Sequence, residues 1–255
     1  MNKKILETLI ERRSSALKSF ALLIDPDKIT DPGKLVKLIN IAVENTVDFF
    51  FVGGSLLTGN NLHQVIELIK SNSQLPVVLF PGSTMHIDVS ADAVLFLSLI
   101  SGRNPELLIG QQVIAAPILK RSNLEILPTG YMLIDADNHT TVSYMSNTMP
   151  IPADKYSVAV CTAMAGEMLG LKLIYMDAGS GARFPINPRM IAAVRRSIDV
   201  PLIIGGGINS VDKAISSLKA GADMLVVGNG IEENPNLLIE VSDAINNLNQ
   251  ELDIH

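Results

Sequence analysis

Eight short apolar runs, spaced along the whole chain, constrain its fold more than any other feature. Each run is apolar throughout rather than alternating, which is typical of parallel strands that are buried on both faces. Segments with helical periodicity lie between many of the runs, so most strands should lead through a helix to the next parallel strand. The runs cover residues 20–25, 49–55, 76–83, 93–101, 130–135, 171–179, 201–207 and 223–230.

The helical segments begin with recognisable capping residues. Asp31, Asn187 and Asn234 each precede a proline, so the first residue can cap a helix whose first turn holds the proline. Ser210 is placed to cap the helix that follows the seventh run. Eight strands alternating with helices predict one domain over residues 1–255, a closed (β/α)8 TIM barrel.

One connection breaks this pattern. Only the segment TMHIDVSADA, residues 84–93, separates the third and fourth runs, and it is too short for an ordinary helix of three turns. Either this crossover is extended, or the strand count is wrong by one and the sheet is open and doubly wound. The pattern of apolar runs alone leaves both architectures open.

Composition limits the class of protein and its partners. Apolar residues make up 47% of the chain and tryptophan is absent, so the core must be aliphatic. The formal net charge is −6 and basic residues do not cluster, which argues against nucleic acid as a partner. No uncharged apolar run approaches the roughly 20 residues that span a bilayer, so we expect a cytoplasmic protein without stable membrane insertion. Cys161, the single cysteine, is expected to be a buried thiol in a reducing compartment.

Glycines follow three successive strands at the end where a barrel carries its active site. In such barrels the loops after strands seven and eight commonly bind phosphate through backbone N–H groups. A side chain at Gly206 or Gly207 would keep an anion away from those donors, so we interpret the three loops as a phosphate site. The alternative is that each glycine only permits a tight turn. The glycines are Gly179, Gly181, Gly205, Gly206, Gly207, Gly228 and Gly230.

Three further side chains at predicted strand ends could carry chemistry. Asp25 and Ser55 follow neighbouring strands, and their oxygens could share Mg²⁺, a hard cation that also takes water and substrate phosphates. The alternative is that Asp25 ends a strand in a turn and Ser55 caps a helix. Asp177, at the end of the sixth run, could act as general base on a substrate hydroxyl, or it could cap its own loop.

Five motifs give the chain a resemblance to a known family. They are LIDPDK, FVGGS, YMDAGSGA, IIGGGI and VVGNG, which run in family order from residue 22 to residue 230. With these motifs the sequence resembles the geranylgeranylglyceryl phosphate synthase family, which includes bacterial polyprenylglyceryl phosphate synthases. That family is a TIM barrel in which an extended segment replaces the third helix, and this would account for the short crossover.

The resemblance implies a prenyltransferase. Its members join the C3 hydroxyl of sn-glycerol 1-phosphate to C1 of a polyprenyl diphosphate such as geranylgeranyl diphosphate, releasing pyrophosphate, and they assemble as homo-oligomers. It implies Mg²⁺ at Asp25 and Ser55, and Asp177 as base, where the family usually has Glu. The glycerol phosphate site would comprise Tyr175, Met176, Asp177, Ala178, Gly179, Ser180, Gly181, Gly206, Gly207, Gly228 and Asn229.

Two other functions remain open at this point. Asp25 and Asp135 follow the first and fifth runs, and two acids on opposite sides of a phosphate-binding barrel could isomerise a phosphosugar. Asp135 equally suits a turn. A barrel that binds phosphate without catalysis is the second alternative. His86 is the one histidine expected near the rim, in the loop after the third run.

Overall fold

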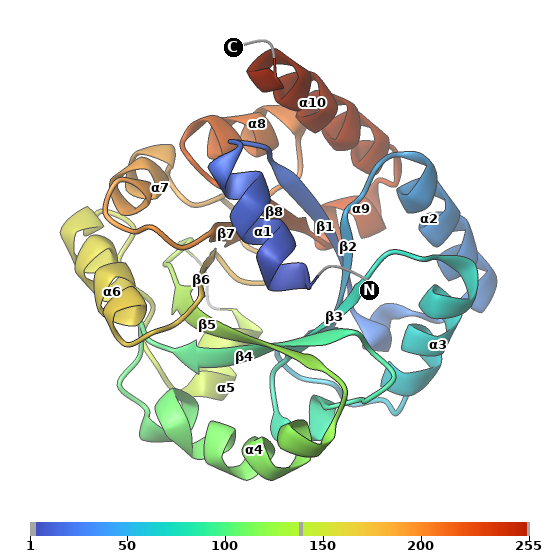
Figure 1. Cartoon of the computed structure of the whole chain (residues 1–255), viewed down its shortest axis with the longest axis horizontal. Coiled ribbons are helices and arrows are strands. Elements are labelled where there is room, and N and C mark those ends of the chain that lie inside the picture. Colours follow the sequence, from blue (N-terminus) through green and yellow to red (C-terminus); the bar gives the residue numbers. More distant parts are fainter. Residues whose placement is uncertain (1–3, 138–139, 254–255) are drawn as a thin grey trace.

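The computed structural model describes residues 4–137 and 140–253 and contains a closed barrel of eight parallel strands (Figure 1). Neighbouring strands pair in chain order, and the last strand pairs with the first to close the barrel. The predicted (β/α)8 barrel is therefore confirmed. The strands are β1 (Ser19–Ile24), β2 (Phe49–Gly54), β3 (Val77–Pro81), β4 (Ala93–Leu99), β5 (Glu125–Leu133), β6 (Leu173–Asp177), β7 (Leu202–Gly205) and β8 (Met224–Val227).

Alternate residues of each strand belong to two separate apolar layers. In β6, Leu173 and Tyr175 pack in the layer inside the barrel, whereas Ile174 and Met176 pack in the layer between the barrel and the helices. All four are at most 1% exposed. Because both faces of the strands are buried, the strands contain uninterrupted apolar runs.

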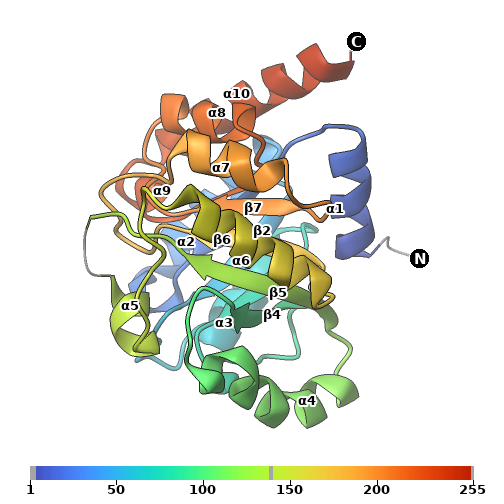
Figure 2. The ribbon, with the colours of Figure 1, turned by 90° about the vertical axis from the view of Figure 1, so that its left-hand side faces the viewer.

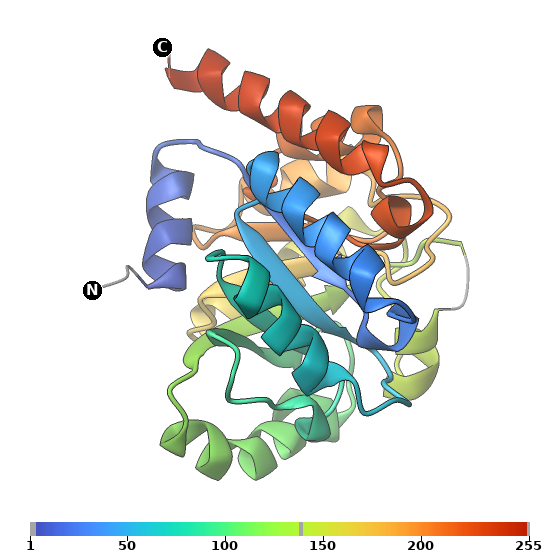
Figure 3. The same ribbon diagram turned by 90° about the vertical axis from the view of Figure 1, so that its right-hand side faces the viewer.

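The helices surround the barrel (Figures 1 and 3). Three predicted caps are confirmed, since Asp31, Asn187 and Ser210 each accept a backbone N–H in the first turn of the helix they precede. In the described part of the chain, none of the helices is long and apolar enough to cross a membrane. The helices are α1 (Ile5–Ser14), α2 (Pro32–Glu44), α3 (Leu62–Asn72), α4 (Gln111–Arg121), α5 (Thr141–Ser146), α6 (Tyr156–Met168), α7 (Pro188–Arg195), α8 (Val211–Lys219), α9 (Asn229–Glu233) and α10 (Asn236–Asp253).

The connection between β3 and β4 is extended, as the short segment suggested. It holds only the 3-10 helix η2 (Thr84–His86), and no α-helix intervenes between the two strands. The outer side of the barrel is therefore less covered here than where a full helix packs.

The fifth strand differs from its predicted bounds. We expected residues 130–135, but β5 begins at Glu125, five residues earlier. Pro128 lacks a backbone donor and Gly130 lacks a side chain, and both argue against a strand when only the sequence is considered. A Cβ on Gly130 would lie 2.8 Å from the side chain of Ile100, so close packing explains this glycine.

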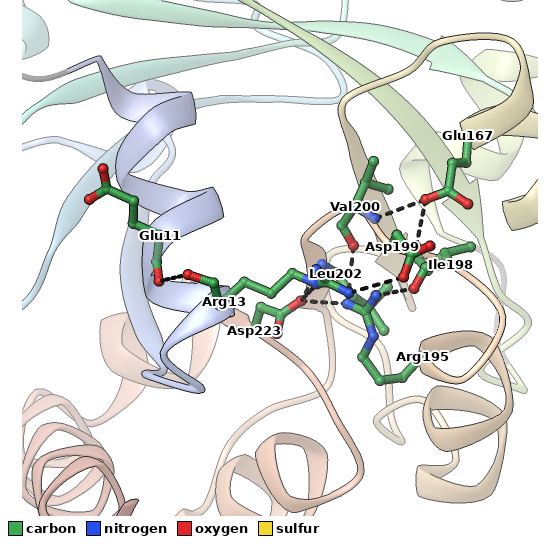
Figure 4. Close-up of polar contacts among 10 residues, drawn as sticks. Glu11, Arg13, Glu167, Arg195, Ile198, Asp199, Val200, Leu202 and Asp223 are labelled. Atoms are coloured by element: carbon green, nitrogen blue, oxygen red, sulfur yellow. Dashed lines mark hydrogen bonds and ion pairs between the residues drawn. The ribbon is translucent and has the colours of Figure 1, made fainter. Parts of the chain in front are cut away.

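Helix α1 closes the amino-terminal end of the barrel (Figure 2). Ile5 and Leu9 pack into the interior layer, and Glu125 accepts the N–H groups of Ile5 and Leu6 at 2.7 and 3.0 Å. Arg13 of this helix lies 3.9 Å from Asp223, a carboxylate that also binds Arg195 (Figure 4). The carboxyl ends of the strands lie at the opposite end of the barrel.

Replacing Asp223 with alanine is expected to lower the free energy of unfolding by about 3–5 kcal/mol. Asp223 accepts hydrogen bonds from the side chain of Arg195 at 2.6 Å and from the backbone of Leu202 at 2.8 Å (Figure 4). Both side chains are nearly buried, at 16% and 11% exposed for Arg195 and Asp223, so the variant would leave a desolvated cation unpaired. Urea denaturation measures the loss.

Asp199 supplies the matched control for this network. Its side chain is fully exposed and lies 3.6 Å from Arg13, so Asp199→Ala should leave the urea midpoint almost unchanged. An equal loss in both variants would contradict the role assigned to the buried pair.

The prediction that Cys161 is buried is wrong. Cys161 lies on α6 and is exposed. The helix is apolar on most sides, and this pattern usually indicates a buried helix. In the single chain, however, the face that carries Cys161 is exposed. On this face, Val158 is 45%, Met168 83% and Leu169 80% exposed, the last residue lying just beyond the helix.

Candidate active site

A pocket of about 270 Å³ opens at the carboxyl ends of the strands. Loops that follow β1, β2, β6, β7 and β8 contribute its walls, and many of the lining residues are glycines. We call this cavity the glycine pocket. Since glycines expose their backbone N–H groups, the pocket is suited to an anion.

Most of the predicted site residues line the glycine pocket. Met176 and Ala178 do not: their side chains are at most 2% exposed and pack in the outer apolar layer. The structure therefore gives these two side chains no place in the pocket. The predicted residues that line it are Asp25, Ser55, Tyr175, Asp177, Gly179, Ser180, Gly181, Gly206, Gly207, Gly228 and Asn229.

The three consecutive glycines at the end of β7, Gly205 to Gly207, have a structural reason in addition to the predicted one. A Cβ on Gly206 would lie 2.7 Å from a carboxylate oxygen of Asp177, and one on Gly207 would lie 2.5 Å from the carbonyl oxygen of Phe184. Both residues also have a positive φ, of 81° and 68°. A Cβ at Gly205 would collide with the hydroxyl of Tyr175. Because the three glycines have no side chain, Tyr175 of β6 and the loop that follows β6 can pack against them, whether or not the pocket binds a phosphate.

Gly181 differs from those three. Its φ is 74°, and within 4 Å a Cβ would meet only the amide of Asn229, at 3.9 Å. The space beside Gly181 is thus open to the pocket.

Asp177 is a buried carboxylate with two fixed hydrogen bonds. Tyr131 donates its hydroxyl to one oxygen at 2.6 Å, and the N–H of Gly179 binds the other at 2.7 Å. Burial raises the pKa of Asp177, which the two hydrogen bonds only partly offset. Burial, with the charge of Asp177, raises the pKa of Tyr131 well above its usual value, so this hydroxyl stays a donor. The arrangement makes Asp177 more basic than an exposed aspartate.

Tyr131 and its aromatic neighbours form part of the pocket lining. The ring of Phe80 lies 5.1 Å from that of Tyr175 and 5.9 Å from that of Tyr131. Sequence reasoning missed Tyr131, although it stands in a predicted strand, because its contact with Asp177 depends on the register of β5 and β6.

Asp25 and Ser55 both line the glycine pocket. One oxygen of Asp25 accepts the N–H of Asp27 at 3.1 Å, and a Cβ on Gly54 would lie 3.7 Å from the same oxygen. Burial raises the pKa of Asp25, so a bound cation would be favourable there. Helix α3 is preceded by Asn61 rather than Ser55, which excludes the capping role for Ser55.

These oxygens are compatible with Mg²⁺. No cluster of three or more His, Cys, Asp or Glu side chains forms a metal site among residues 4–137 and 140–253. Mg²⁺ commonly takes only one or two protein oxygens and completes its shell with water and substrate phosphates. A carboxylate and a hydroxyl fit that requirement, whereas zinc would need more protein ligands.

A polar chain spans the mouth of the glycine pocket. Lys28 donates to Asn229 at 2.6 Å and to Glu232 at 2.7 Å, and Asn229 donates to Ser180 at 3.1 Å. It joins loops that follow β1, β6 and β8. No sequence pattern predicts it, because its hydrogen-bonded pairs are 49 to 204 residues apart.

A second cavity, of about 360 Å³, adjoins the first. Ser55, Gly82 and Tyr131 line both cavities. The second cavity reaches Val94 at the start of β4 and Leu119 near the end of α4, so it extends toward the amino-terminal end of the barrel. We call it the apolar groove. Its apolar lining includes Leu56, Leu95, Phe96, Leu107, Ala115 and Leu119.

The acid pair of the isomerase alternative does not meet in a cavity. Asp135 is exposed, accepts the N–H of Asp137 at 3.0 Å and lines neither the glycine pocket nor the apolar groove. Its turn interpretation is therefore favoured, and Asp25 has no second acid from β5 opposite it.

A closed (β/α)8 barrel with a glycine-lined pocket at the carboxyl ends of its strands is the architecture of a barrel enzyme. The chain belongs to the PcrB family, whose model matches residues 10–247.

Relatives and a solved structure that bear the name geranylgeranylglyceryl phosphate synthase confirm the resemblance drawn from the five motifs. A geranylgeranylglyceryl phosphate synthase of Spirosoma linguale is 56% identical over 242 residues, covering 95% of this chain and 97% of that protein. The synthase of Thermococcus kodakarensis is 42% identical over 228 residues, 89% of each chain. The crystal structure of (S)-3-O-geranylgeranylglyceryl phosphate synthase from Thermoplasma acidophilum, in complex with its substrate sn-glycerol-1-phosphate, has a TM-score of 0.89 and 32% identity, covering 95% and 98% of the two chains.

Proposed function

We propose that the protein is a prenyltransferase that joins sn-glycerol 1-phosphate to a polyprenyl diphosphate through an ether bond. The observation that carries this proposal is the junction of the two cavities. A polar pocket lined by glycines meets an apolar groove at Ser55 and Gly82, so a small phosphate and a long hydrocarbon can lie end to end. The relatives named above carry the same activity in their names.

In the proposed complex, the glycerol phosphate occupies the glycine pocket. The N–H groups around Gly181, Gly207 and Asn229 would face its phosphate, and its C3 hydroxyl would lie toward Asp177. The prenyl chain fills the apolar groove and presents C1 at the junction. This placement holds the nucleophile in line behind the leaving group, which is the main advantage of binding both substrates together.

The reaction exchanges one carbon–oxygen bond for another and moves one proton. The C3 oxygen bonds to C1 of the prenyl chain, and the bond between C1 and the diphosphate oxygen breaks with its electron pair leaving on pyrophosphate. The hydroxyl proton passes to Asp177, which Tyr131 holds in place. Asp25 and Ser55 would hold Mg²⁺, which neutralises charge on the diphosphate when bound.

Two further properties stay predictions. We expect a homo-oligomer, which the exposed apolar faces of α4 and α6 support, since Val113 is 63% and Met168 83% exposed. We also expect a cytoplasmic location.

Mass spectrometry of the products tests the proposed function. Pure protein with Mg²⁺ is incubated with prenyl diphosphates of C15 to C35 and with either sn-glycerol 1-phosphate or sn-glycerol 3-phosphate. We expect an ether from the 1-phosphate only, with the preferred diphosphate reporting the length of the groove. Folded protein that forms no ether would refute the proposal. Turnover of a phosphoribosyl substrate would then favour the isomerase, and phosphate binding without turnover would favour the non-catalytic barrel.

A further inference from the structure

His86 binds the backbone of Gly82, a residue that lines both cavities, but it has no role in the reaction described above. It ends η2, is 9% exposed and lines the apolar groove beside Gly82. Next to it the groove is lined by the apolar Met85 and Ile87 and by the polar Ser83 and Thr84. The ring nitrogens of a buried imidazole need hydrogen-bond partners.

The backbone fixes the protonation of this ring. The N–H of Gly82 donates to Nδ1 of His86 at 3.2 Å, so Nδ1 must be the unprotonated nitrogen. Burial lowers the pKa of His86 and favours the neutral ring. A neutral ring with an accepting Nδ1 carries its proton on Nε2. No group in the described residues accepts a hydrogen bond from Nε2, which leaves one donor available.

Gly82, whose N–H binds the other ring nitrogen, lines both cavities and so lies at their junction. A Cβ on Gly82 would lie 2.5 Å from the carbonyl oxygens of both Gly54 and Ser55, so the ends of β2 and β3 touch. A prenyl chain in the apolar groove must leave its diphosphate at this junction, where Ser55 lies. Asp27, the acid whose charge acts on His86, is already bound by Thr58 and Gly59 and does not take up the donor.

We propose that His86 binds the diphosphate of the prenyl substrate through Nε2–H. The hydrogen bond goes to a non-bridging oxygen, and it strengthens as charge builds on the departing pyrophosphate. His86 stays neutral and transfers no proton, since the hydroxyl proton goes to Asp177. This inference rests on the proposed function, and it adds a residue that recognises the leaving group.

Two amide variants separate the proposed role from a structural one. In His86→Asn the side-chain oxygen can still accept from Gly82, but nothing reaches the position of Nε2. In His86→Gln an amide N–H₂ can occupy that position. We expect the Asn variant to weaken pyrophosphate binding, measured by calorimetry with Mg²⁺, about tenfold to hundredfold, and the Gln variant to stay within about threefold of wild type.

Three further readouts complete the test. The KM for geranylgeranyl diphosphate should rise in the Asn variant, while the KM for sn-glycerol 1-phosphate stays unchanged. Geranylgeraniol, which lacks the diphosphate, should inhibit all three proteins equally. Equal pyrophosphate affinity in wild type and the Asn variant would overturn the proposal. So would an equal loss in both variants, or a matching loss of geranylgeraniol binding, each of which would indicate a structural role.

The proposed function can fail independently of this inference, because pyrophosphate binding needs no turnover. If the wild type formed no ether and the Asn variant still lost pyrophosphate affinity, the prenyltransferase would be refuted while His86 would remain an anion-binding residue. If the wild type formed ether but His86→Asn bound pyrophosphate normally, the reverse would hold.

Discussion

Asp25→Ala is expected to lower kcat by about 10²- to 10³-fold while sn-glycerol 1-phosphate still binds. Burial raises the pKa of Asp25, and one of its oxygens has no hydrogen bond to the described residues, so the carboxylate is suited to a cation. Loss of the cation leaves the charge on the departing diphosphate uncompensated. The backbone N–H groups around Gly207 and Asn229 are untouched, so phosphate affinity should persist. Steady-state kinetics across a Mg²⁺ titration, with calorimetry for glycerol phosphate, measures both effects.

Asp31 provides a matched control for this prediction. It follows Asp25 by six residues, but its side chain caps α2 and lies outside both cavities. Asp31→Ala should therefore lower stability slightly and leave the Mg²⁺ dependence of kcat unchanged. If Asp25→Ala kept the wild-type response to Mg²⁺, the metal assignment would be wrong.

The barrel was predictable because its strands are buried on both faces. Val77, Val78 and Leu79 of β3 are all 0% exposed, and such segments are apolar at every position. The start of β5 was not predictable, because that segment contains residues that disfavour a strand. Pro128 and Gly130 are unfavourable for a strand when considered alone. The close packing of Ile100 and Ile174 against Gly130 explains that glycine, and it is visible only in the structure.

The candidate site was predictable only in part. Residues at strand ends lie together in any barrel, so the sequence could place Asp25, Ser55 and Asp177 around one pocket. It could not say what occupies the space beside a glycine. At Gly206 and Gly207 that space is filled by the loop after β6, whereas at Gly181 it is open.

The apolar groove lay beyond sequence reasoning altogether. A short crossover between β3 and β4 shows that a helix is missing, but not whether side chains fill the space. Here Val94 and Phe96 of β4 and Leu119 of α4 belong to the outer apolar layer and still leave a cavity beside them. The exposure of α6, the helix that carries Cys161, was equally unpredictable. An apolar pattern indicates that a helix is covered, but it does not say whether the same chain or another chain covers it.

Asp177→Asn is the second variant with a large expected effect, a fall in kcat of about 10²- to 10⁴-fold. An amide keeps the shape of the side chain: its oxygen can accept the N–H of Gly179 while its NH2 donates to the hydroxyl of Tyr131. It cannot take the proton of the C3 hydroxyl. The KM for sn-glycerol 1-phosphate should change much less than kcat, because the phosphate binds elsewhere in the pocket. Asp135→Asn, on an exposed acid outside both cavities, should leave kcat unchanged.

The pH dependence of kcat distinguishes a base from a purely positioning role for Asp177. Burial raises its pKa above the ordinary value of about 4, so the ionised base is lost as the pH falls through that raised pKa. Wild-type kcat should therefore decline on the acid side, and the residual kcat of Asp177→Asn should lack that decline. Asp177→Glu, which keeps a carboxylate on a side chain one methylene longer, should recover much of the activity. If Asp177→Asn kept the wild-type kcat, or if Asp135→Asn lost all activity instead, Asp177 would not be the base and another residue would have to take the proton.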